Sequence, residues 1–144
     1  MARLVTYLFG KPKNSNIRNL IDDYTSRIAK RGISVIYFPE KKGILEYENK
    51  LLSLDGKLIL ADENGEKMKS LQFANFIKNI QLHAAKIHFA IGPSSGFSKK
   101  IKEEANSLIS LSRMTFPHEL AALLLIEQIY RGMEIIRNSP YHVE

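Results

Sequence analysis

The amino-acid sequence predicts an α/β protein with a mostly parallel sheet flanked by helices. Short apolar runs of the type found in strands alternate with segments whose apolar residues recur at helical spacing. This alternation is typical of a parallel sheet with helices on its faces. The 144 residues match the common size of one domain, and no repeat, linker or low-complexity segment divides them. We therefore expect a single domain over residues 1–144.

The first half of the chain contains three predicted strands and two predicted helices. Residues 4–9 are expected to form the first strand and Ile33–Phe38 the second, because both are apolar runs that end at glycine or proline. A charged helix is expected over residues 41–53. A short strand over residues 58–61 should lead into a turn at residues 62–65. The helix between the first two strands is predicted by apolar residues at helical spacing, namely Ile17, Leu20, Ile21, Tyr24 and Ile28.

The second half continues the same alternation. Ser70 suits the N-cap of a helix that carries Phe73, Phe76, Ile77 and Ile80. A strand over residues 87–91 ends in the loop 92–96, and Ser98 is expected to cap a helix through Ala105.

The last predicted elements are a short strand at Ser107–Ser110 and a long helix over residues 117–136. Pro117 in the first turn and Glu119 near the positive end of the helix dipole are both favourable there. A polar tail, 137–144, follows.

Composition limits the classes of partner. Lysine plus arginine outnumber aspartate plus glutamate by 21 to 15, which gives a net charge of +6. A basic surface attracts polyanions such as RNA, although a solvated basic face is the simpler explanation. The absence of cysteine excludes disulfides and thiolate metal sites and fits the cytoplasm. Four histidines without a close H-x-x-x-H pair give no case for a metal, and no apolar run is long enough to predict a membrane span.

Turn chemistry follows three of the predicted strands, at residues 61–65, 92–96 and 110–117. In open α/β sheets, ligands bind beyond the carboxyl ends of strands where such loops converge. Neither glycine-containing loop matches a phosphate-binding fingerprint, and tight turns alone could explain the glycines. The third loop is unusually apolar, because it carries Leu111, Met114 and Phe116. Either a partner subunit or a flat apolar ligand such as adenine should cover it.

The same segments carry a specific resemblance. Residues 89–97 (FAIGPSSGF), 109–118 (ISLSRMTFPH), 125–131 (LIEQIYR) and 140–142 (PYH) are similar in order and spacing to motifs of one enzyme family. That family comprises the bacterial SPOUT-class methyltransferases that act on N3 of a pseudouridine in 23S ribosomal RNA. The resemblance is dense from about residue 89 to the C-terminus. Earlier in the chain it covers residues 4–10 and 61–65.

The resemblance implies a trefoil-knotted α/β fold, S-adenosylmethionine as cofactor, and a homodimer that acts on ribosomal RNA in the assembled ribosome. It also implies that each active site is completed by the tail of the neighbouring protomer. The cofactor contacts carry over, mostly through backbone groups, onto Ala61, Gly92, Leu111, Ser112, Arg113, Met114, Thr115 and Phe116.

The tail supplies the candidate catalytic residues. A uracil-type imino nitrogen is a poor nucleophile while protonated, so a base or a group that stabilises the developing anion should help. We expect His142 to deprotonate or position the target base and Tyr141 to stack on it or hydrogen-bond to it. Without the resemblance, a histidine two residues from the terminus would be interpreted as a solvated side chain. His118 is expected to cap the cofactor loop, whereas packing or exposure suffices for His83 and His88.

Three basic residues are candidate RNA contacts. Arg131 lies four residues after Glu127, so a helix-surface ion pair and a phosphate contact are equally good explanations of it. Lys11 and Lys13, near Arg18 in the first loop, could hold the RNA backbone, with a solvated basic face as the default.

Two departures from the family pattern leave alternatives open. Pro93 stands where relatives usually have a second glycine, and Ala122 stands where they usually have an arginine. Proline removes a backbone donor and fixes φ. A catalytically degenerate paralogue that binds RNA or the ribosome is therefore one alternative, and a small α/β enzyme acting on an unrelated metabolite is another.

Overall fold

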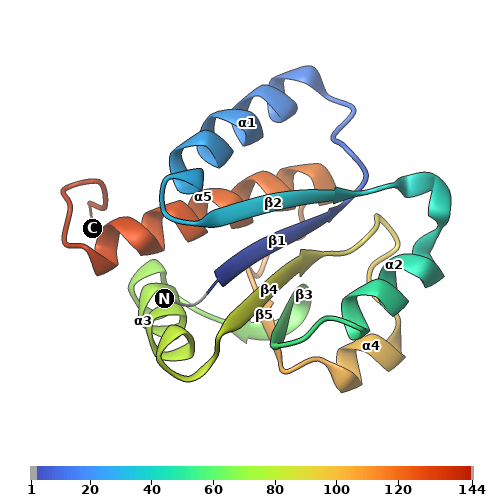
Figure 1. Ribbon diagram of the computed structural model, residues 1–144. Coiled ribbons are helices and arrows are strands. Elements are labelled where there is room, and N and C mark those ends of the chain that lie inside the picture. Colours follow the sequence, from blue (N-terminus) through green and yellow to red (C-terminus); the bar gives the residue numbers. More distant parts are fainter. Residues whose placement is uncertain (1–2, 144) are drawn as a thin grey trace.

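The computed structural model describes residues 3–143 and contains a five-stranded sheet (Figure 1). The order of the strands is β2-β1-β4-β3-β5, and each of the four described strand pairs is parallel. This architecture confirms the predicted α/β class. The strands are β1 (Arg3–Phe9), β2 (Ile33–Phe38), β3 (Lys57–Lys67), β4 (Lys86–Ile91) and β5 (Ser107–Ser110).

Helices cover both faces of the sheet. One face packs against α1 (Ser15–Ala29), α3 (Ser70–His83) and α5 (His118–Ile136), and the other packs against α2 (Ile44–Leu52) and α4 (Lys99–Glu104) (Figure 1). Strand residues supply the two cores alternately, because successive side chains point to opposite faces. In β1, Leu4 and Leu8 belong to the core under α5, whereas Val5 and Tyr7 belong to the core under α2.

The prediction that residues 58–61 form a short strand followed by a turn is wrong, because β3 continues to Lys67. Ala61 and Glu66 both pair with Ile109, so residues 62–65 bulge out of the ladder between β3 and β5. The turn chemistry is used inside this bulge, where the main-chain N–H of Asn64 donates to Asp62 at 3.0 Å. Gly65 passes so close to β5 that an added Cβ would lie 2.5 Å from the carbonyl carbon of Ile109.

Two helix starts also differ from the predictions. The expected helix over residues 41–53 is divided by Gly43 into a short 3-10 helix, Glu40–Lys42, and α2. Ser70 is inside α3 rather than at its N-cap, which is Lys69. The Ser70 hydroxyl instead donates to Gln128 at 2.7 Å and so ties α3 to α5. The Ser98 cap and the last strand and helix are where the sequence predicts them, with Pro117 as N-cap residue of α5.

The knotted path of the chain, which the resemblance implies, stays a prediction. Within residues 3–143, no helix combines the length and apolarity needed to cross a bilayer. In the same range, no group of three or more His, Asp and Glu side chains is placed to hold a metal ion.

Candidate cofactor site and C-terminal tail

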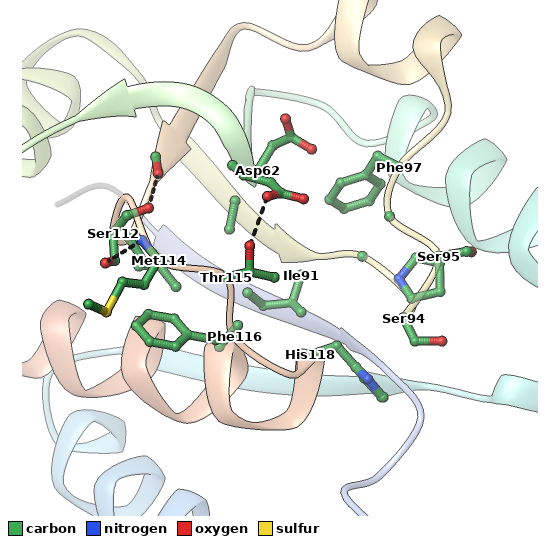
Figure 2. A pocket seen from close by; sticks show the side chains of 18 residues that line it. Asp62, Ile91, Ser94, Ser95, Phe97, Ser112, Met114, Thr115, Phe116 and His118 are labelled. Atoms are coloured by element: carbon green, nitrogen blue, oxygen red, sulfur yellow. Dashed lines mark hydrogen bonds between the residues drawn. The ribbon is translucent and has the colours of Figure 1, made fainter.

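The loops that follow β4 and β5 and the bulge of β3 meet around a cavity of about 200 Å³ (Figure 2). Ala61, Asp62 and Glu63 come from β3, and residues 92–97 come from the loop after β4. The loop after β5 supplies most of the remaining wall. The cavity therefore lies at the carboxyl ends of adjacent parallel strands, which is the position expected for a ligand site.

A second cavity of about 250 Å³ lies on the other side of the loop after β5. Ser110, Leu111 and Phe116 line both cavities, so this loop is the wall between them. The second cavity is largely apolar, with Met68, Phe73 and Leu124 in its lining.

Short-range hydrogen bonds fix the shape of the loop after β5. The Ser110 hydroxyl donates to the carbonyl of Ser112 at 2.8 Å, and the Ser112 hydroxyl accepts from the main-chain N–H of Met114 at 3.0 Å. Further along, the Thr115 hydroxyl donates to a carboxylate oxygen of Glu63 at 3.2 Å (Figure 2). This last bond connects the loop after β5 to the β3 bulge across the first cavity.

The loop after β4 is a tight turn. The main-chain N–H of Gly96 donates to the carbonyl of Pro93 at 2.8 Å, and Gly96 has a φ of 82°. Only glycine adopts this left-handed conformation without steric cost. Pro93 is buried and contributes its carbonyl to the turn, so the departure from the family pattern is accommodated locally.

Two residues of α2, Tyr47 and Glu48, form hydrogen bonds at the two ends of this loop. The hydroxyl of Tyr47, which is fully buried, donates to the carbonyl of Ile91 at 2.7 Å and also lies 3.2 Å from the carbonyl of Tyr7. Burial raises the pKa of Tyr47 far above its ordinary value, so the hydroxyl keeps its proton. Glu48 is also buried, and it accepts from both the main-chain N–H and the hydroxyl of Ser98 at 2.9 and 2.5 Å.

Acidic side chains give the first cavity a negative edge. Asp62 and Glu63 both line it, and the side chain of Asp62 is only 7% exposed. The ammonium of Lys102 on α4 lies 3.2 Å from Asp62 and compensates this buried charge.

Most of the cofactor residues predicted from the sequence are brought together here. Arg113 is the exception, because its side chain is exposed and lines neither cavity. The predicted cofactor residues that line the first cavity are Ala61, Gly92, Leu111, Ser112, Met114, Thr115 and Phe116. Sequence reasoning did not assign a site role to Asp62 or Glu63, although the turn chemistry at 62–65 was the available signal. His118, expected to cap the loop, also lines the cavity.

The predicted catalytic residues lie in a different place. Neither Tyr141 nor His142, both of which the structure describes, lines either cavity. Helix α5 begins at the first cavity and its 19 residues extend for about 28 Å before the tail starts. The tail then turns back at the end of α5 (Figure 1). Tyr141 in this tail contacts α1 and α5 of its own chain.

Tyr141 is packed and hydrogen-bonded on these two helices. Its hydroxyl donates to Glu127 at 2.7 Å and lies 3.4 Å from the hydroxyl of Tyr24. Its ring meets the ring of Tyr130 edge-on, with centroids 4.7 Å apart. Burial, followed by the hydrogen bonds with Tyr24 and Glu127, raises the pKa of Tyr141 far above its ordinary value.

Arg131 joins Glu127 to both tail residues. It forms the predicted ion pair with Glu127 at 2.8 Å, and this carboxylate raises the pKa of the guanidinium. The guanidinium also stacks 4.9 Å from the centroid of the Tyr141 ring and lies 3.1 Å from Nδ1 of His142.

The loop that carries Lys11 and Lys13 is fastened to the start of α5. Glu119 accepts from the main-chain N–H groups of Lys13 and Asn14 at 2.9 and 3.2 Å, which holds the pKa of Glu119 below its ordinary value. Both lysines are exposed, and the Lys11 ammonium lies 5.9 Å from the centroid of the Tyr37 ring. Ala122 is buried in the core nearby, so this position adds no charge to the loop.

Several known proteins are similar to this chain. A solved structure, the SpoU methyltransferase AviRb of Streptomyces viridochromogenes in complex with AdoMet, is 12% identical, with a TM-score of 0.49 over 92% of this chain and 59% of that one. Among curated relatives, "Ribosomal RNA large subunit methyltransferase H" of Prochlorococcus marinus is 38% identical and is matched over 99% of this chain and 97% of its own. The relative of the same name from Flavobacterium johnsoniae is also 38% identical, over 92% of this chain and 94% of its own. The model of the family described as "Predicted SPOUT methyltransferase" matches residues 2–142. This chain therefore belongs to the SPOUT methyltransferase family.

Proposed function

We propose that this chain transfers a methyl group from S-adenosylmethionine to N3 of a pseudouridine in the 23S RNA of the large ribosomal subunit. The observation that carries the proposal is a pair of cavities built around Leu111 and Phe116. The family resemblance assigns both of these residues to the cofactor. Curated relatives matched over nearly the whole chain have names that specify ribosomal RNA methyl transfer.

The chemistry of the two cavities suits this cofactor. The apolar cavity beside Phe73 and Leu124 offers a surface for a flat adenine ring, because aromatic and aliphatic side chains favour such groups. The cofactor also carries a positive sulfonium and a positive ammonium. Glu63 gives the first cavity a complementary negative group, whereas Asp62 is already paired with Lys102.

When bound, the cofactor supplies an electrophilic methyl group on its sulfonium. The protein contributes position, since alignment of the reacting atoms is the main requirement of an in-line displacement. The hydrogen bonds of Ser110, Ser112 and Thr115 hold the wall between the cavities in a fixed shape. Tyr47 and Glu48 hold the opposite wall through Ile91 and Ser98.

We also propose that the active unit is a homodimer in which the tail of one protomer completes the site of the other. The position of the tail supports this arrangement, because neither Tyr141 nor His142 lines a cavity of its own chain. A second copy that brought its tail to the cavity would place His142 and Tyr141 beside the target base.

The net charge of +6 is suited to RNA, and we assign the first contacts with its phosphates to Lys11 and Lys13. Glu119 holds their loop at the end of α5 that adjoins the first cavity. Arg131 is a third candidate for a phosphate contact. With ribosomal RNA as the substrate, we place the protein in the cytoplasm.

Calorimetry with S-adenosylmethionine, followed by mass mapping of 23S RNA methylated in single turnover, tests the proposal directly. We expect saturable cofactor binding and one methylated pseudouridine. Absence of cofactor binding would instead identify an RNA- or ribosome-binding factor that has lost transfer. Cofactor binding without RNA affinity that weakens with rising salt would point to a small metabolite as substrate.

Complementation tests the shared site. Leu111→Trp should obstruct both cavities, and His142→Ala removes the tail imidazole. Either variant alone should lose most of the native activity. Mixed and re-equilibrated protomers should recover about one quarter of native activity, because about half of the dimers are mixed and each has one intact site. If the mixture stays as inactive as the single variants, the proposal of a shared site is wrong. The calorimetric test of cofactor binding by the native protein does not depend on this result.

A further inference from the structure

Arg131 has a defined arrangement of hydrogen bonds in the tail cluster. Its Nε and Nη2 atoms donate to the two carboxylate oxygens of Glu127 at 3.4 and 2.8 Å. Its remaining nitrogen, Nη1, lies 3.1 Å from Nδ1 of His142. The ion pair therefore sets the orientation of the guanidinium, and that orientation directs one N–H toward a single atom of the imidazole ring.

A guanidinium donates hydrogen bonds and accepts none, because it stays protonated at all relevant pH values. Nδ1 of His142 must therefore be the acceptor in this contact. A neutral imidazole has one acceptor nitrogen and one donor nitrogen, so the proton is on Nε2.

We propose that Arg131 is a positioning residue that fixes His142 as an Nε2–H hydrogen-bond donor, so that His142 stabilises the anionic form of the target base rather than removing its proton. This inference rests on the proposed function and specifies the role of one residue in it. It decides between the two roles that the sequence left open for His142.

The chemistry is balanced without a histidine base. The N3 proton of the pseudouridine passes to water, and the negative charge spreads over N3 and the neighbouring carbonyl oxygens of the base. The N3–methyl bond then forms as the bond between sulfur and the methyl carbon breaks, which leaves a neutral thioether and a neutral base. An N–H donor directed at a carbonyl oxygen stabilises the charge that develops before transfer.

The surroundings of His142 leave its contact with Arg131 without a competing partner. A groove of about 460 Å³ runs beside the ring, lined also by Leu71, Ile135, Asn138, Ser139 and Val143. Among the described residues of this lining, His142 is the single titratable group, so no carboxylate there competes with Arg131 for the imidazole. The opposite side of the ring carries Arg131, which can only donate to it.

Nuclear magnetic resonance of the ¹⁵N-labelled native protein without cofactor or RNA measures the tautomer itself. We expect the Nδ1 resonance of His142 in the unprotonated range and the Nε2 resonance in the protonated range. Arg131→Met should give averaged resonances of exchanging tautomers, and Arg131→Lys, which keeps a donor, should restore the native pattern in part. Circular dichroism confirms that the variants are folded. A proton on Nδ1 in the native protein would overturn the inference, whatever the protein methylates.

A pair of substitutions measures the consequence in single turnover. The amide nitrogen of glutamine can donate near the position of Nε2 but cannot accept a proton as a base. His142→Gln should therefore react about tenfold or more faster than His142→Ala, as the loss of a hydrogen bond to a charged group predicts. Equal rates for the two variants, beside an active native protein, would refute the donor role. An inactive native protein would refute the proposed function instead, and the resonance experiment would still decide the tautomer.

Discussion

Replacement of Tyr47 by phenylalanine tests whether the Tyr47 hydroxyl stabilises the start of the loop after β4. The ring is fully buried and packs against Phe9, Phe38 and Phe97, so phenylalanine keeps the packing and removes the hydroxyl alone. The carbonyl of Ile91 then loses its 2.7 Å hydrogen bond in a buried position. Loss of a hydrogen-bond partner by a buried carbonyl costs about 1–2 kcal/mol. This is the lower part of the usual range for a lost partner, because the carbonyl oxygen has a second lone pair that can still accept.

For a chain of this size the expected fall in Tm is about 2–8 °C, measured by differential scanning calorimetry. Because Ile91 directly precedes Gly92, the affinity for S-adenosylmethionine should fall as well. Tyr37→Phe is the matched control, since Tyr37 is half-buried on β2, away from the cavities, and its change should stay within about 0.5 kcal/mol. If Tyr47→Phe matched the native Tm, or if both variants lost equal stability, the reasoning about the Ile91 carbonyl would be wrong.

Three further predictions concern the loops around the cavity. Hydrogen bonds from main-chain N–H groups, that of Lys13 foremost, lower the pKa of Glu119. The Glu119 carboxylate therefore stabilises the fold fully above the ordinary glutamate range, and this stabilisation disappears as pH falls through the lowered pKa. Urea unfolding should therefore find Glu119→Gln less stable than native protein at pH 7, with a difference that closes on acidification; a difference that persisted in acid would contradict this. Lys11→Ala and Lys13→Ala should each reduce the slope of log affinity for ribosomal RNA against log salt by about 1, and unchanged slopes would remove both from the RNA interface. Thr115→Val breaks the exposed bond to Glu63, so the cofactor dissociation constant should rise by no more than about fivefold, whereas a hundredfold rise would indicate direct contact with the cofactor.

The order of strands and helices was predictable because apolar spacing is a local property. Ile33–Phe38 and Ser107–Ser110 have the bounds expected from the sequence. The continuation of β3 was not predictable, since it depends on pairing with β5, about 40 residues later in the chain. The side-chain partner of Ser70 was equally hidden, because Gln128 lies on a helix that only the tertiary fold brings beside α3.

The arrangement of residues around the two cavities was predictable in part. The loops at the strand ends indicated a ligand site, and the resemblance selected most of its residues. The acidic edge was missed because Asp62 and Glu63 resemble ordinary turn residues when no neighbouring loop is in view. The ion pair between Glu127 and Arg131 followed from their spacing, but the contact of Arg131 with His142 depends on how the tail folds back, which no local pattern records.

The length of helix α5 sets the position of the tail relative to the first cavity, because this one continuous helix begins at the cavity and ends where the tail turns back. Each inserted residue would rotate everything beyond it by about 100° and advance it by about 1.5 Å. A single insertion would therefore point the tail in another direction, although no residue of either cavity had changed. The length of this helix should therefore tolerate little variation.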